Sequence, residues 1–237
     1  MIKQVLVIAF VFVSLTTVNA KDKLNTRDAK RHAYLIEKVE KEKKFDVVML
    51  GDSITHLLDI PEQLHPNWRK QSGKNNAYLK KKFRRKDILI AGISGETTAQ
   101  LLSRLQHGLA KAKSEYTVIM IGTNDARSPV TVEQVADNIK EMIKLIKKKN
   151  PRTKILLYAI FPRGGTPAKD SANQKNEKVN EILATFPKKF RRLKFININK
   201  DFLDKKGNLS RTIMYDLLHP SLEGYKVWIK SLKSIIK

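Results

Sequence analysis

The sequence predicts an α/β protein in which helices cover both faces of a parallel sheet. Five short runs are rich in valine and isoleucine and lack polar alternation, which is typical of strands buried on both faces. Segments with helical periodicity separate these runs, and such alternation of strands and helices favours parallel pairing. The expected strands span residues 46–50, 87–91, 116–121, 154–160 and 193–198.

The expected helices begin before the first strand. Residues 25–44 place alanine, leucine, isoleucine and valine at helical spacing among lysines and glutamates. The segment 131–149 opens with Thr131 and Gln134, which is close to a capping box, and it ends before Pro151. Residues 60–82 hold one helix or two short ones. The remaining helices are expected at residues 97–113, 171–186 and 221–236, and Pro220 suits the first helical position of the last one.

The first twenty residues are interpreted as a secretory signal peptide. Lys3 gives a positive start, residues 5–15 form an apolar run, and residues 18–20 suit a cleavage site. The apolar run is shorter than the roughly 20 residues that span a bilayer. Cleavage would leave residues 21–237 as a single domain. The signal peptide predicts export of that domain to the periplasm or to the medium. An uncleaved N-terminal anchor is the alternative, and no later segment is apolar enough to span a membrane.

Composition excludes some classes of site. The chain has no cysteine, which rules out disulfides, thiol catalysis and thiolate metal sites. Lysine and arginine number 47 against 23 aspartate and glutamate, a formal charge of +24 that attracts polyanions and anionic surfaces. The basic runs at residues 80–86, 147–149 and 188–192 lie where helices should end. Cations at a helix C-terminus interact favourably with the helix dipole, and this structural role explains much of the excess positive charge. No basic run has the interleaved aromatics of a single-strand binder, and we expect no specific nucleic-acid partner.

Three of the expected strands end in short glycine-containing motifs. Gly51-Asp52-Ser53 follows the first strand, residues 92–98 follow the second, and Gly122-Thr123-Asn124-Asp125 follows the third. Ligands in open α/β sheets bind beyond the carboxyl ends of the strands, especially where the winding reverses. With the strand order 2-1-3-4-5, the first strand lies between the second and the third. Ser53 would then sit between Gly95 and Asn124.

This arrangement fits acyl transfer by a serine nucleophile. Ser53 needs a base, and the base needs a carboxylate that fixes its tautomer. Asp216 and His219 lie three residues apart before the last helix and can supply that pair. The backbone N–H groups of Ser53 and Gly95 and the side-chain amide of Asn124 can stabilise the oxyanion, and each such donor commonly contributes about 10²–10³ in rate.

Each motif taken alone also has a structural explanation. Gly-Asp-Ser and Gly-Thr-Asn-Asp both occur in ordinary turns, and Asp216 or His219 could simply cap the last helix. Ser94 is a weaker rival to Ser53 because no strand leads directly into it. The other histidines lack a matching partner at useful spacing and are interpreted as surface or structural residues, namely His32, His56, His65 and His107. All four motifs in order favour catalysis more strongly than any one of them.

Together these motifs resemble the four blocks of the SGNH (GDSL-type) hydrolase superfamily, over residues 46–228. The resemblance implies a flavodoxin-like three-layer α/β/α sandwich whose five-stranded parallel sheet has the order 2-1-3-4-5. It implies hydrolysis without a cofactor or a metal. It also implies that Ser53, His219 and Asp216 form the triad, and that Ser53, Gly95 and Asn124 form the oxyanion hole.

Within the superfamily, the chain is most similar to the platelet-activating factor acetylhydrolase subunit group. The similarity rests on Phe-Pro-Arg-Gly at residues 161–164 and on the Lys-Asn and Val-Asn pairs within residues 175–180. In that group the residues after the serine, before the asparagine and before the histidine shape a small acyl pocket. Here they are Ile54, Thr123 and Leu218, which implies acetyl or another short acyl group. Residues 168–172 depart from the group's pattern, so its leaving-group contacts do not carry over.

The expected function is hydrolysis of short-chain carboxylic esters, with an O-acetylated extracellular glycan or a small molecule as the substrate. A lipolytic esterase, lysophospholipase or thioesterase is the alternative within the same chemistry. An alternative of another class is a basic, non-catalytic module that binds anionic surfaces or polymers. The positive charge could also steer a catalytic protein electrostatically towards an anionic surface.

Overall fold

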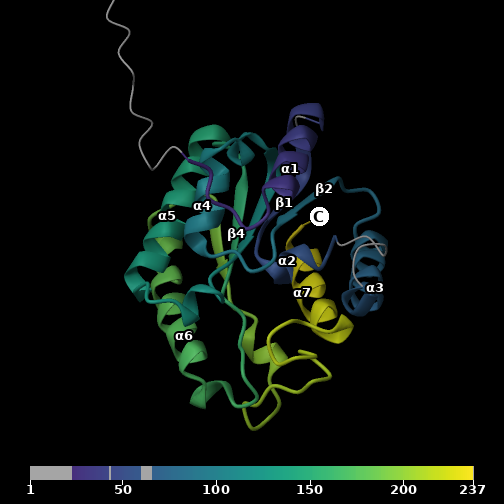
Figure 1. Cartoon of the computed structure of the whole chain (residues 1–237), viewed down its shortest axis with the longest axis vertical. Helices are drawn as coiled ribbons and strands as arrows, with labels where there is room; N and C mark the ends of the chain where they lie inside the picture. The colour runs from purple at the N-terminus through teal and green to yellow at the C-terminus, as the bar shows by residue number, and fades with distance from the viewer. Residues whose placement is uncertain (1–22, 43, 60–65, 237) are drawn as a thin grey trace, which may run out of the picture.

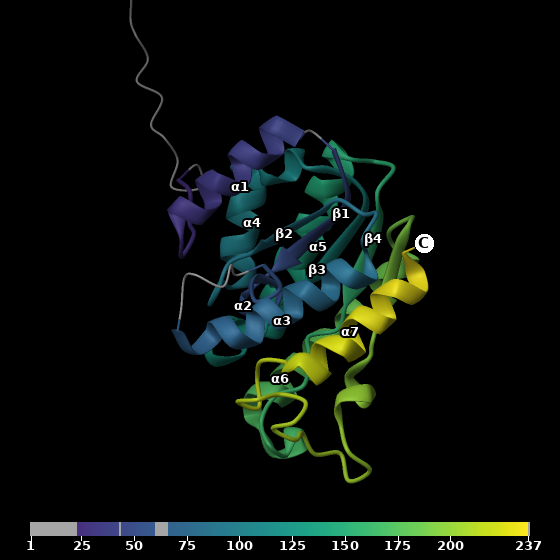
Figure 2. The same cartoon turned by 90° about the vertical axis from the view of Figure 1, so that its right-hand side faces the viewer.

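A parallel sheet of five strands forms the centre of the computed structural model, which describes residues 23–42, 44–59 and 66–236 (Figures 1 and 2). The strand order is β2-β1-β3-β4-β5, and every neighbouring pair is parallel. Both the predicted fold class and the predicted order are therefore confirmed. The strands are β1 (Lys44–Gly51), β2 (Ile88–Gly92), β3 (Lys113–Met120), β4 (Lys154–Tyr158) and β5 (Leu193–Ile196).

Helices cover the sheet on both sides (Figure 2). Helices α1, α4, α5 and α6 pack on one face, and α3 and α7 pack on the other. A short helix, α2, follows β1 directly. The helices are α1 (Ala29–Glu42), α2 (Ser53–His56), α3 (Pro66–Lys82), α4 (Thr98–Gln106), α5 (Val132–Lys149), α6 (Ser171–Leu183) and α7 (Leu222–Ile235).

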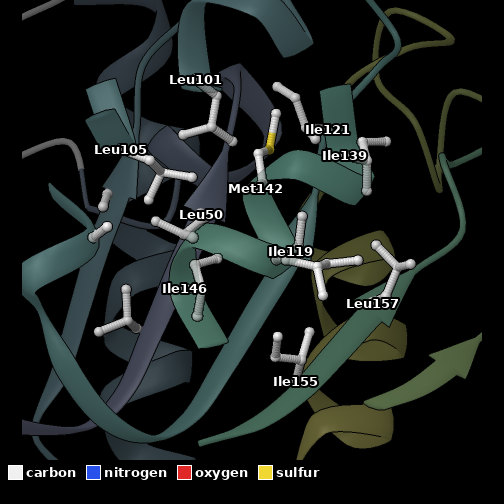
Figure 3. Close-up of a cluster of buried hydrophobic side chains, with 14 of the residues drawn as sticks. Leu50, Leu101, Leu105, Ile119, Ile121, Ile139, Met142, Ile146, Ile155 and Leu157 are labelled. Atoms are coloured by element: carbon white, nitrogen blue, oxygen red, sulfur yellow. The ribbon is translucent and has the colours of Figure 1, made fainter. Parts of the chain in front are cut away.

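Each face of the sheet has its own apolar core, because successive strand residues point to opposite faces. In β1, Val48 and Leu50 belong to the core under α4 and α5, whereas Val47 and Met49 belong to the core under α3 and α7. Figure 3 shows the first core, in which Leu50 lies among leucines of α4 and isoleucines of α5 and β3. Full burial of one such side chain contributes about 1.5–3 kcal/mol. The prediction of burial on both faces thus holds for most of β1 to β4, but it was wrong for β5, where Lys194 is exposed and Phe195 is half-buried.

Several predicted boundaries were wrong. The helix expected at residues 97–113 ends at Gln106, because Gly108 adopts a φ of +113° that an α-helix cannot continue. A separate 3₁₀ turn, Leu109–Lys111, leads into β3. The first helix starts at Ala29 rather than at residue 25. The uncertain stretch before β2 contains one helix, α3, and residues 60–65 lie outside the described residues.

The expected signal peptide, residues 1–20, also lies outside the described residues, so the leader and the mature domain 21–237 stay predictions. Across the described ranges, no helix combines the length and the apolar character that a membrane crossing requires.

Candidate active site

A sharp turn at the end of β1 presents Ser53. A Cβ built on Gly51 would lie 2.2 Å from Thr55 Oγ1 and 2.4 Å from Met120 O, so the turn accepts only glycine there. Asp52 caps α2, and its Oδ1 accepts the Ile54 N–H at 3.0 Å. Ser53 is therefore the first residue of α2, and it is only 5% exposed.

The structure brings the three residues of the predicted triad within hydrogen-bond distance of one another. Ser53 Oγ lies 2.9 Å from His219 Nε2, and His219 Nδ1 lies 2.7 Å from Asp216 Oδ2. The other carboxylate oxygen, Oδ1, accepts the backbone N–H groups of Leu218 at 3.1 Å and His219 at 2.7 Å. These contacts orient the imidazole so that its Nε2 faces the serine hydroxyl, which is the geometry of nucleophile, base and orienting acid.

The charge on Asp216 is favoured by its surroundings. Partial burial alone would raise the pKa of this carboxyl, but hydrogen bonds from the His219 N–H and the His219 ring outweigh it, so the pKa is lowered. The side chain is 39% exposed. An ionised Asp216 can stabilise the imidazolium that forms when His219 takes the serine proton.

The loop before α7 is held in place by its backbone. Leu217 has a φ of +62°, and its carbonyl accepts the Gly164 N–H at 2.9 Å. Tyr215 stacks its ring on that of His219, with centroids 5.9 Å apart. Ser221 is the N-cap of α7, so neither triad residue caps this helix. The expected placement of Pro220 at the first helical position was wrong, because Pro220 precedes the cap.

The other two motif loops lie against each other and against the nucleophile turn. Asn124 Nδ2 donates to Glu96 O at 2.8 Å, which leaves the second amide hydrogen of Asn124 for a ligand. The Ile93 N–H donates to Gly51 O at 3.2 Å and ties the Gly95 loop to the Ser53 turn. Gly95 has a φ of +77°. The predicted oxyanion donors therefore come from neighbouring loops at one edge of the sheet.

Buried carboxylates lie beneath these loops. Burial raises the pKa of Asp52 to about 7, with smaller contributions from Asp125 and Glu96, and its Oδ2 has no hydrogen-bond partner in the described part of the chain. Burial also raises the pKa of Asp125, although this carboxylate accepts the N–H and O–H of Thr98 at 2.7–3.2 Å. Glu96 pairs with Arg104 at 2.7 Å, and both side chains are fully buried. Sequence reasoning did not single out these acids as a cluster.

The surroundings of Ser94 make it a weaker candidate nucleophile than Ser53. Ser94 Oγ lies 3.0 Å from His56 Nδ1, and the Ser94 N–H points to the same nitrogen at 3.2 Å. Burial lowers the pKa of His56 to about 3, so this imidazole is a weak base near neutral pH. This weak basicity is consistent with a structural role for His56. Its partner is Ser94, which lies 38 residues away and was not found from sequence spacing.

The residues expected to shape the acyl pocket lie close to the triad in sequence but differ in exposure. Ile54 is 1% exposed, and its carbonyl accepts the Tyr225 hydroxyl at 2.7 Å. Thr123 is buried, and Arg163 Nη1 donates to its carbonyl at 2.9 Å and lies 3.3 Å from its hydroxyl. Leu218 is half-buried. The prediction that Ile54, Thr123 and Leu218 together shape a small acyl pocket stays a prediction. Arg163 is a buried cation that sequence reasoning noted only as part of the group's motif.

Comparisons with known proteins show which family this chain resembles. Residues 49–227 match the GDSL-like lipase/acylhydrolase family. The chain is 32% identical to platelet-activating factor acetylhydrolase IB subunit alpha2 from Rattus norvegicus over 197 residues, which is 83% of this chain and 78% of the relative. Subunit alpha1 from the same organism is 30% identical, with 83% and 77% covered.

Two solved structures illustrate the shared fold. A GDSL-like lipase from Bacteroides thetaiotaomicron has a TM-score of 0.61 at 25% identity, covering 88% of this chain and 94% of its own. An acetylxylan esterase from Geobacillus stearothermophilus has a TM-score of 0.59 at 18% identity, covering 82% and 94%. The similarity to the acetylxylan esterase shows a shared fold and nothing more.

Proposed function

The chain belongs to the GDSL-like lipase/acylhydrolase family and is a carboxylic ester hydrolase, and from this premise we propose that it removes acetyl or other short acyl groups through Ser53, His219 and Asp216. The observation that carries the proposal is the continuous chain of short contacts, 2.9 Å from Ser53 Oγ to His219 Nε2 and 2.7 Å from His219 Nδ1 to Asp216 Oδ2. Each contact is within hydrogen-bond reach, as nucleophile activation requires.

The reaction follows from these positions. Ser53 Oγ attacks the ester carbonyl carbon while His219 Nε2 takes the hydroxyl proton. The tetrahedral intermediate collapses, the C–O bond to the alcohol breaks, and His219 returns the proton to the leaving oxygen. A water molecule then attacks the acyl-enzyme with His219 as base, and it releases the carboxylic acid and free Ser53.

The oxyanion of each intermediate needs preorganised donors. The N–H groups of Ser53 and Gly95 and the second amide hydrogen of Asn124 are the proposed donors. The hydrogen bond from Asn124 to Glu96 O supports this role, because it fixes the amide before substrate arrives. Glu96 is itself held by Arg104, so the donor loop rests on a buried ion pair.

The proposed substrate is an O-acetylated extracellular glycan. The acetylhydrolase name of the 32% identical relative supports a small acyl group, and the acetylxylan esterase with the same fold supports a glycan. The expected export of the chain is consistent with an extracellular substrate. A lipolytic esterase would need a longer acyl groove, and burial of Ile54 does not favour one.

Hydrolysis of nitrophenyl esters from acetyl to decanoyl tests this proposal, with the mature protein and its Ser53→Ala variant. Activity confined to short acyl groups and lost in the variant is the expected result. Activity on long chains would keep the triad but overturn the short-chain preference. Full activity of Ser53→Ala would overturn the mechanism.

A second candidate function rests on a basic hollow at the amino ends of β4 and β5. This hollow has a volume of about 420 Å³ and is lined by Lys147, Arg152, Lys189, Arg191 and Arg192. In the described ranges, none of these cations forms an ion pair with a carboxylate. An anionic polymer could bind there, and retention on heparin that disappears in moderate salt tests this role.

A further inference from the structure

An exposed arginine, Arg27, lies directly on a proposed oxyanion donor. A Cβ built on Gly95 would be 2.9 Å from Arg27 Nε and 3.3 Å from Arg27 Cζ, so the guanidinium covers this glycine. Arg27 is exposed, and no carboxylate pairs with it among the described residues. The arginine therefore stands at the active-site edge with its charge available.

Contacts on either side of Arg27 hold it at this position. The Asn25 N–H donates to Ser103 Oγ at 2.8 Å, which fastens the segment to α4 (Figure 1). The Thr26 hydroxyl donates to the buried carboxylate of Glu96. On the other side, Asp28 Oδ1 accepts the Arg31 N–H at 2.9 Å at the start of α1. The segment that carries Arg27 is thus tied to the Gly95 loop, rather than projecting freely.

A second exposed arginine accompanies the other donor loop. Arg127 ends the 3₁₀ turn Asp125–Arg127, which begins directly after Asn124. Lys175 Nζ donates to the carbonyls of Asp125 at 3.0 Å and Ser128 at 2.9 Å, so this turn is fixed to α6. Arg127 also has no carboxylate partner in the described part of the chain.

The hydrogen bond from Asn124 to Glu96 O joins the loop that carries Arg127 to the Gly95 loop, which the Arg27 side chain covers. The buried Arg163 adds a third guanidinium, bonded to Thr123 O at 2.9 Å. Asp216, the acid of the predicted triad, lies in hydrogen-bond contact with His219 Nδ1. Arg27 and Arg127 are thus exposed cations without a carboxylate partner in the described part of the chain, and a bound anionic group would supply that partner.

We infer that Arg27 and Arg127 bind a negatively charged group on the substrate, so that the enzyme selects esters that carry a carboxylate, phosphate or sulfate near the acyl group. Guanidinium groups suit this task because their planar donors match the oxygens of such anions. The inference rests on the proposed function, since it assigns a substrate class to the same site. Both arginines act as specificity-determining residues and not as members of the triad.

A matched pair of acetyl esters tests the inference. 4-Acetoxybenzoate carries one negative charge, and its methyl ester is neutral with the same scissile bond. In Arg27→Gln or Arg127→Gln, kcat/KM for the anionic ester should fall about tenfold, mainly through KM, while the neutral ester stays within about twofold. High salt should reduce the preference of the wild-type enzyme for the anionic ester.

Controls separate binding from structural roles. Lys148→Gln removes one exposed charge at the C-terminal end of α5, and it should leave the ratio of the two esters unchanged. Arg27→Lys keeps the charge and should restore part of the loss on the anionic ester. Thermal melting of each variant confirms that it is folded.

The outcomes distinguish the two proposals. Equal losses on both esters in Arg27→Gln would mean that Arg27 only supports the Gly95 loop, and an unchanged ratio in both arginine variants would also overturn the inference. Neither result affects the proposed triad. Hydrolysis of the neutral methyl ester by Ser53→Ala would instead refute the proposed function itself.

Discussion

Asp216 makes three hydrogen bonds, and together they decide the proton arrangement of the triad. Its Oδ2 lies 2.7 Å from His219 Nδ1, which favours the tautomer with the ring proton on Nδ1, so Nε2 can accept a proton from Ser53. Its Oδ1 accepts the N–H groups of Leu218 and His219, which fix the backbone of the tight turn. One carboxylate thus sets both the tautomer and the position of the base.

Replacing Asp216 with asparagine should separate these roles. Asparagine can still accept the two backbone N–H groups through its amide oxygen, but its amide nitrogen cannot accept from His219 Nδ1. The base would then hold the wrong tautomer, and kcat for acetyl ester hydrolysis should fall by roughly 10³–10⁴. The same substitution in a Ser53→Ala background should cost almost nothing more, because triad members act as a unit. A loss below about tenfold in the single variant would contradict the assigned role.

His56 predicts a dependence of stability on pH. Burial lowers its pKa to about 3 from the ordinary value of 6.5, with Arg31 acting in the same direction. Between these values the unfolded chain binds the proton more readily than the folded chain, so this contribution to stability is complete above pH 6.5 and is lost as pH falls towards 3. Urea midpoints of the wild type and His56→Gln should therefore converge on acidification. Parallel curves over this range would show that folding does not lower the pKa of His56.

The chemistry of single residues was predictable where it depends on local sequence. Ser53 follows a strand through a glycine turn, and Asp216 lies three residues before His219, so spacing was enough to predict that these side chains lie close together. The raised pKa of Asp52 and the pairing of His56 with Ser94 depend on side chains far apart in the sequence, 38 residues in the second case. No local pattern encodes these contacts, because they arise only when β2 lies beside β1.

At the scale of elements, the start of α7 links stability to catalysis. Ser221 Oγ accepts the N–H groups of Glu223 at 3.1 Å and Gly224 at 3.3 Å, and its hydroxyl donates to Thr212 O in the loop that carries the triad acid. The cap therefore fastens the helix and the catalytic loop together. His219 lies only two residues before it, so a change at the cap should reach the active site.

Ser221→Ala should cost about 1 kcal/mol of stability and lower the melting temperature by roughly 2–4 °C. It should also lower kcat, because the loop that orients His219 loses its anchor. Thr131→Ala is the matched control: Thr131 caps α5 by accepting the Gln134 N–H at 3.2 Å, and it is exposed. The control should show a similar loss of stability with unchanged kcat. Equal kcat in both variants would mean that the Ser221 cap is purely structural.

Element boundaries were less predictable than element types. The capping box at Thr131 correctly marked the start of α5, because a cap is a local interaction. The leucine stripe of α4 suggested a longer helix, but Gly108 ends it and its neighbours turn towards β3. Pro220 was assigned a helical position by its preference alone, whereas the hydrogen bonds of Ser221 decide where α7 begins.

At the scale of the whole molecule, the parallel sheet separates the candidate active site from the basic hollow. All three glycine motifs follow carboxyl ends of β1, β2 and β3, so they converge at one edge, as parallel pairing requires. The basic runs before β4 and β5 precede the amino ends of those strands and so gather at the opposite edge. Alternation of strands and helices was enough to predict that the three glycine motifs converge at one edge. It was not enough to predict the hollow, which depends on how residues 189–192 fold back towards Lys147.

This separation leads to a final prediction about charge. If the basic hollow is the main polyanion site, Arg191→Gln combined with Arg192→Gln should elute from heparin at clearly lower salt than the wild type, because two unpaired cations are lost. Lys205→Gln combined with Lys206→Gln removes the same charge from an exposed loop outside the hollow, and it should change elution much less. Hydrolysis of a neutral acetyl ester should be equal in all three proteins, since the hollow lies at the opposite edge from Ser53. Equal shifts in both double variants would attribute retention to net charge alone, and inhibition of neutral ester hydrolysis by heparin would place the polyanion at the active-site edge instead.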